Sequence, residues 1–196
     1  MDRTQRGVKG IIIQAAQITL ARYGFKKTTM DEIAKSTHLA KSSLYYYFRS
    51  KEKIFEAILE QEMQTLMADV SQAVMAENSP PEKLRAFFRS RLHAMQNATN
   101  FYRAIMDEYF EYYLYIEGLR KSFDAQEMKI IAGILKEGIK TGVFAIDHVK
   151  STMVAFRAAL RGIEYYYLIV EKKFKKIEEI QDLILRTLFN GSRCKY

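Results

Sequence analysis

Hydrophobic residues recur every three or four positions through most of this sequence, the spacing that places side chains on one face of an α-helix. The first such stretch predicts a helix over residues 8–23, and Gly24 suits the position just past its end. The predicted inner face of this helix consists of Ile12, Ala16, Leu20 and Tyr23. Because proline occurs only twice in 196 residues, little interrupts the helical pattern.

The same spacing predicts further helices along the rest of the chain. They lie over about 50–76, about 80–97 and most of 101–115, the last of these with an end near Gly118. After them come a long helix that stops at Gly142, a helix capped by Asp147, and a last helix that holds Ile177, Ile180, Ile184 and Leu188. Together with the helices before residue 50, this predicts an all-α fold of about nine helices.

Residues 28–53 begin with two short predicted helices that are joined by a tight turn. Thr29 and Glu32 form a capping box at the start of the first helix, in which each side chain accepts a hydrogen bond from the other residue's amide. Residues 37–40 have no strong helix signal and are predicted to be the turn.

The second short helix is predicted over residues 41–48 and has two different faces. Leu44 and Phe48 are four positions apart, so they share the inner face. Its other face has small polar residues, tyrosines and a leading lysine, namely Lys41, Ser42, Ser43, Tyr45 and Tyr46. Such a face suits a DNA major groove, because small residues allow close approach and hydroxyls and lysine donate to bases and phosphates. The alternative is a three-helix packing unit with a solvated polar face.

One pattern of residues at fixed offsets covers Gly24-Phe25, Thr28-Thr29, Ile33-Ala34, Leu39–Phe48 and Ser50-Lys51-Glu52. This pattern resembles the N-terminal domain of the TetR family of transcriptional regulators. Two positions depart from the family pattern. His38 stands where the family usually has Gly in the turn, so we expect it in a left-handed conformation that it tolerates less well. Ala40 stands where Ser usually caps the next helix, which costs on the order of 1 kcal/mol.

The resemblance implies which residues contact DNA. Lys41, Ser42, Tyr45 and Tyr46 are expected to contact bases and nearby phosphates, whereas Thr28, Thr29, Tyr47 and Lys51 are expected to contact mainly the backbone. With Ser43, these residues form the predicted DNA-binding set. The resemblance also implies a DNA-binding domain over residues 1–50 and a helical effector-binding and dimerisation domain over 51–196.

The second domain has two candidate functional features. Its last two helices have apolar stripes, and in the TetR family this pair forms a four-helix dimer interface; an ordinary intramolecular bundle fits the stripes equally well. Its aromatic and methionine residues are candidates for an effector cavity, although such stripes are usually core. The candidate cavity residues are Phe88, Leu92, Met95, Phe101, Tyr102, Met106, Tyr109, Phe110, Tyr113, Met128, Ile131, Phe156, Leu160 and Tyr165, with Arg157 and Arg161 for an anionic group.

Charge strengthens the DNA prediction. The formal net charge is +8, and residues 1–50 contribute +6 of it through nine basic and three acidic residues. Such a concentration is the electrostatic footprint of a polyanion partner. The one cysteine excludes an intrachain disulfide and a cysteine-cluster metal site, and fits a reducing cytoplasm. No apolar run reaches the roughly 20 residues of a membrane span.

The sequence therefore predicts a cytoplasmic, homodimeric DNA-binding regulator without cofactor or metal. Its expected partners are a roughly palindromic operator in double-stranded DNA and a small hydrophobic or amphipathic effector that releases a repressor. The alternative is a helical DNA-binding adaptor whose second domain binds a protein. An enzyme has little support, because the three histidines are scattered and no HExxH, G-x-S-x-G or phosphate-binding glycine loop is present.

Overall fold

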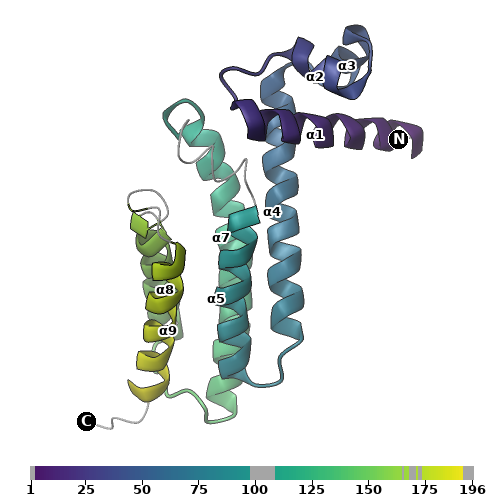
Figure 1. The fold of residues 1–196 in the computed structure, drawn as a ribbon. Helices are drawn as coiled ribbons and strands as arrows, with labels where there is room; N and C mark the ends of the chain where they lie inside the picture. The colour runs from purple at the N-terminus through teal and green to yellow at the C-terminus, as the bar shows by residue number, and fades with distance from the viewer. Residues whose placement is uncertain (1–2, 98–108, 165, 168–170, 172–173, 192–196) are drawn as a thin grey trace. The chain divides into compact units, whose positions relative to one another are not determined.

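The structure of the chain, a computed structural model, describes residues 3–97, 109–164, 166–167, 171 and 174–191. These ranges contain eight α-helices and no β-strand, so the predicted all-α fold is confirmed (Figure 1). The helices are α1 (Arg3–Tyr23), α2 (Met30–Thr37), α3 (Lys41–Tyr47), α4 (Lys51–Met75), α5 (Pro80–Asn97), α7 (Tyr109–Lys140), α8 (Val149–Glu164) and α9 (Phe174–Gly191).

One predicted helix boundary is wrong. The sequence placed the end of a helix near Gly118, but α7 continues through this residue from Tyr109 to Lys140. A single glycine inside a long helix costs only about 1 kcal/mol relative to alanine, which neighbouring helical residues can outweigh. The predicted helix over 101–115 lies mostly outside the described residues.

Contacts between residues divide the chain into two compact units. The first, here called the head, includes the described residues up to Thr65 and the first residues of α7; the second unit includes Leu66–Asn97 and the residues from Leu114 onward. The helix α4 thus contributes to both. The division lies later in α4 than the domain boundary predicted between residues 50 and 51.

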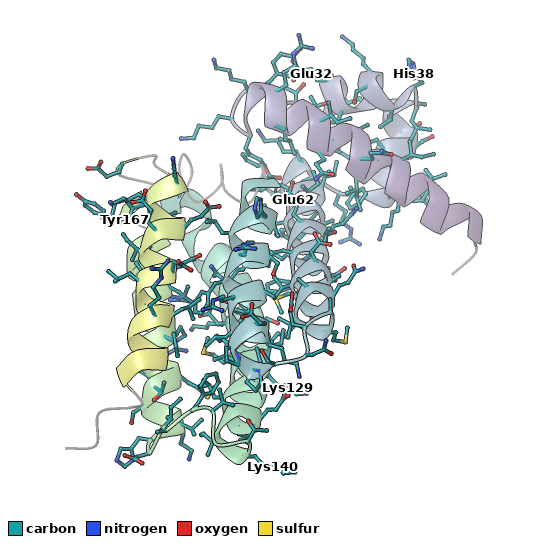
Figure 2. All side chains as sticks on the ribbon, turned by 60° about the horizontal axis from the view of Figure 1, so that its bottom comes forward. Glu32, His38, Glu62, Lys129, Lys140 and Tyr167 are labelled. Atoms are coloured by element: carbon teal, nitrogen blue, oxygen red, sulfur yellow. The ribbon has the colours of Figure 1, made fainter. Side chains whose placement is uncertain are left out.

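The core of the head includes a stripe of α1 residues that are four positions, about one helical turn, apart. Ile12, Ala16 and Leu20 of α1 are buried as predicted, whereas Tyr23 at the end of that stripe is 52% exposed. The other helices of the head add buried residues to the same core, namely Ile33, Leu44, Ile54, Phe55, Ile58 and Leu59 from α2, α3 and α4. A hydrogen bond of 2.8 Å from Gln17 to the buried Glu62, which Figure 2 labels, also joins α1 to α4.

The second unit packs α5 and α7 in antiparallel orientation. Lys83 near the start of α5 pairs with Glu137 near the end of α7, and Arg91, further along α5, pairs with Glu127, earlier in α7. The apolar core of this unit includes Leu84, Phe87, Phe88, Leu92, Ile131, Leu135, Phe156, Leu160, Ile177 and Leu185. No helix in the described part of the chain is long and apolar enough to cross a membrane.

Candidate functional site

The start of α2 has the predicted capping box. The Thr29 hydroxyl accepts a hydrogen bond from the amide of Glu32 at 3.3 Å, and the Glu32 carboxylate accepts one from the amide of Thr29 at 2.7 Å. Two amides that the helix itself leaves unpaired are thereby satisfied. The residues concerned are neighbours in sequence, so the entry into the helix-turn-helix is set locally.

The turn between α2 and α3 shows both predicted departures. His38 has φ 56 and ψ 22, the left-handed conformation that glycine adopts more readily. Ala40 precedes α3 in an extended conformation and makes no side-chain capping hydrogen bond. Glu32 and His38, in the first turn of α2 and just past its end, are labelled in Figure 2.

The short helix α3 has one buried and one exposed face. Leu44 is fully buried and Phe48, just past the helix, is 6% exposed, so these two residues attach α3 to the head. In contrast, Tyr45 is 43% and Tyr46 73% exposed. The remaining predicted contact residues of α3 are also exposed or half-buried, namely Lys41, Ser42, Ser43 and Tyr47.

Lys41 is held at the edge of this face by an acidic neighbour. Its ammonium lies 2.6 Å from the carboxylate of Asp31 in the first turn of α2, and both side chains are more than half exposed. The hydrogen bond with Asp31, and then the charge of Asp31, raise the pKa of Lys41 above its ordinary value. Lys41 is therefore a cation at neutral pH. In this exposed pair, a phosphate can take the place of the Asp31 carboxylate as the partner of Lys41.

Thr28 and Lys51 differ from the other residues predicted to contact DNA, because their side chains donate hydrogen bonds to carbonyls of the protein itself. Thr28, expected to contact mainly the DNA backbone, is fully buried, and its hydroxyl donates to the carbonyl of Gly24 at 2.8 Å. The Lys51 ammonium donates to the carbonyls of Phe25 and Thr28. Thr29 is exposed, with its hydroxyl in the capping box. Sequence spacing did not indicate these partners of Lys51, because they lie 26 and 23 residues away.

The predicted effector residues of the second unit fall into three groups. Phe88, Leu92, Ile131, Phe156 and Leu160 are buried in the core, and Phe88 packs on Phe156 with ring centroids 5.8 Å apart. Met128 and Arg161 are half-buried, whereas Arg157 is exposed. The side chains of Met95, Phe101, Tyr102, Met106, Tyr109, Phe110, Tyr113 and Tyr165 lie outside the described residues.

An open cavity of about 320 Å³ lies between α5 and α9 in the second unit. Of the predicted cavity residues whose side chains the structure describes, Phe88 is the one in its lining. Its other lining residues are Arg85, Arg89 and His93 of α5 and Glu178, Glu179, Gln181, Asp182 and Leu185 of α9. None of these other lining residues was predicted, because the predicted effector residues are aromatic, methionine and aliphatic side chains with two arginines of α8. The i, i+4, i+8 spacing of the three basic residues on α5 was the available signal.

Ion pairs join three helices inside the second unit. Arg91 of α5 pairs with Glu127 of α7, and the two side chains are 10% and 6% exposed. Arg161 of α8 pairs with Asp124, one turn earlier on α7, at 2.5 Å. The arginine that the sequence offered for an anionic ligand thus contacts a carboxylate of the protein. No group of three or more potential metal ligands is found among the described side chains.

Comparison with known proteins places these features in a family. Residues 12–58, which include α2 and α3, match the family described as bacterial regulatory proteins, tetR family. The HTH-type transcriptional repressor KstR2 of Mycolicibacterium smegmatis is 28% identical over 141 residues, which cover 69% of this chain and 67% of that protein. The similarity therefore extends well beyond the helix-turn-helix.

Solved structures show the same fold over nearly the whole chain. A transcriptional regulator from Cytophaga hutchinsonii has a TM-score of 0.78 and 24% identity, and the match covers 94% of this chain and 98% of that one. The regulator FadR from Bacillus subtilis, in complex with stearoyl-CoA, has a TM-score of 0.70 and 20% identity, with 92% and 97% covered. At these identities the likeness establishes the fold.

Proposed function

Because this chain belongs to the TetR family of DNA-binding transcriptional regulators, we propose that it is a homodimeric repressor that a small hydrophobic or amphipathic effector releases from its operator. The observation that carries the proposal is the division of α3 into two faces. Leu44 attaches the helix to the head, while the side chains of Tyr45 and Tyr46 are exposed. We assign the chain no catalytic activity, and its site of action is the cytoplasm.

The proposed DNA contacts follow from this exposure. Lys41, Ser42, Tyr45 and Tyr46 contact base edges and nearby phosphates in the major groove. Ser43, Tyr47 and Thr29 contribute at the margin of this interface. When DNA approaches, a phosphate replaces Asp31 as the partner of Lys41. Each phosphate neutralised in this way adds to the salt dependence of binding.

The proposed dimer uses α8 and α9. Both helices carry exposed apolar side chains, including Val154 at 58% exposure and Leu183 at 63%, which supports their burial against a second copy. A twofold dimer presents two recognition helices to successive major grooves, so the operator is roughly palindromic.

The proposed effector acts through linkage. A ligand that binds better to the conformation with wrongly spaced heads must weaken DNA binding by the same factor, typically about 1–3 kcal/mol. The cavity between α5 and α9 falls within the size range of small-molecule sites, which supports an effector over the alternative of a protein-binding adaptor. A protein of the same fold binds stearoyl-CoA, an amphipathic molecule.

The test is binding to a labelled duplex from upstream of the chain's own gene, titrated against salt with random duplex as competitor. The proposal expects tight, competitor-resistant binding that weakens steeply with salt. A parallel selection of genomic fragments guards against the choice of a wrong duplex. If that selection yields no preferred sequence, the regulator proposal is overturned.

A further inference from the structure

Lys51, the first residue of α4, directs its charge into the head. Its ammonium donates to the carbonyl of Phe25 at 2.8 Å and to the carbonyl of Thr28 at 3.0 Å. It also lies 4.2 Å from the centroid of the Phe25 ring, within the range of a cation–π contact. A lysine has three N–H donors, so two of them are occupied by the protein's own backbone.

The residues that Lys51 contacts belong to the loop between α1 and α2. Phe25 is 6% exposed, and its ring lies 4.8 Å from that of Phe55. Lys51 and Phe55 are four residues apart on α4 and so lie on the same side of this helix, where both contact Phe25. Thr28 is fully buried and bonded to Gly24, which closes the loop on itself.

The position of this loop determines where α2 begins. Thr28 precedes Thr29, the N-cap of α2, and α2 is followed after a short turn by α3. Hydrogen bonds from a charged donor to carbonyls are shorter and about twice as strong as neutral ones, so Lys51 is well suited to hold the loop. We therefore expect loss of this attachment to displace the start of α2 and, through it, the face of α3.

We propose that Lys51 is a positioning residue for DNA binding. It fixes the loop at residues 24–29 from inside the head and thereby orients α2 and α3, in place of the phosphate contact that its sequence position suggests. The DNA part of this inference rests on the proposed function, whereas the structural part can be tested on the free protein.

The first test is hydrogen exchange of Lys51→Met without DNA. The amides of Gly24 and Thr29, at the two ends of the loop, and of Ile33 in α2 are hydrogen-bonded, and we expect each to exchange at least about tenfold faster in the variant. The matched control is Lys53→Met, which removes an exposed lysine paired with Glu56 on the same helix. Unchanged exchange in Lys51→Met overturns the proposal, because a phosphate contact has no role in free protein.

The second test is the salt dependence of operator binding. We expect Lys51→Met to weaken binding about tenfold or more at every salt concentration, with the slope of log affinity against log salt unchanged. Lys41→Met serves as the reference for a lost phosphate contact, which lowers the slope by about one. A slope lowered by about one in Lys51→Met, with wild-type exchange, overturns the proposal. Failure of the wild-type protein to bind any operator rejects the proposed function and leaves the exchange test valid.

Lys51→Arg separates the two roles if the methionine variant does not fold. Arginine keeps the charge and contacts phosphate well, but its planar fork differs in shape from an ammonium that lies between two carbonyls and a ring. Positioning predicts faster exchange around the loop and weaker operator binding in this variant. Wild-type behaviour in both measurements identifies a phosphate contact and overturns the proposal.

Discussion

The head and the second unit use charged side chains in opposite ways. In the head, Lys41 and Asp31 form an exposed pair beside the polar face of α3. In the second unit, Arg91 and Glu127 form a pair that is almost completely buried between α5 and α7. An exposed pair contributes about 0–1 kcal/mol, whereas removal of one partner of a buried pair costs about 3–5 kcal/mol.

The difference shows which charges are available for binding. An exposed ion pair costs little to open, so its lysine can exchange a carboxylate for a phosphate. A buried pair instead joins helices and cannot release either partner without a large loss of stability. Lys51 shows that location alone is not sufficient, because this lysine lies in the head and still binds backbone carbonyls.

The largest expected effect is that of Glu127→Ala. The variant leaves the buried guanidinium of Arg91 without this carboxylate, so we expect the free energy of unfolding to fall by about 3–5 kcal/mol in urea denaturation. The control is Asp182→Ala, which breaks an exposed pair with Arg186 and should cost less than about 1 kcal/mol. Similar losses in the two variants contradict the distinction between buried and exposed pairs.

Gly138→Ala tests how closely the second unit is packed. A Cβ at this position lies 2.0 Å from a ring carbon of the buried Phe144, so we expect a loss of about 1–3 kcal/mol from the strain of overpacking. Gly133 is in the same helix, with no atom within 4 Å of an added Cβ. Gly133→Ala should therefore stabilise the protein by up to about 1 kcal/mol, measured in the same denaturation series. Stabilisation by both substitutions shows that Phe144 moves aside easily.

Tyr45→Ala tests whether the exposed face of the head serves binding more than folding. We expect the free energy of operator binding, measured by titration, to become less favourable by about 1–3 kcal/mol. The free energy of unfolding should change by less than about 0.5 kcal/mol. Tyr23 is an exposed tyrosine of the head outside α3, so Tyr23→Ala is the control and should retain operator affinity. Unchanged affinity in Tyr45→Ala contradicts the assigned role of Tyr45.

Ala40→Ser has the smallest expected effect and concerns the start of α3. The backbone of Ala40 is extended, as an N-cap requires, but the alanine side chain makes no capping hydrogen bond with the helix. A serine hydroxyl supplies that acceptor, so we expect thermal denaturation of the head to show a gain of about 1 kcal/mol. Ala125→Ser, at an exposed position inside α7, is the control and should lose a few tenths of a kcal/mol. No gain at Ala40 indicates that the start of α3 is already satisfied.

Features that depend on neighbours in the chain were determined by the sequence alone. The capping box of Thr29 and Glu32, the left-handed His38 and the shared face of Leu44 and Phe48 all involve residues within four positions of each other. Helix geometry relates such residues directly, so their arrangement follows from spacing and residue type. The family resemblance was carried by the same short-range pattern.

Only the tertiary structure decided which groups distant in sequence contact each other. It brought Lys51 to the carbonyls of Phe25 and Thr28 and paired Arg91 with Glu127. A long side chain can turn toward solvent or toward the protein, and sequence spacing does not distinguish the two directions. That choice depends on which carbonyls, rings and carboxylates packing places within reach, and on the cost of leaving them without partners.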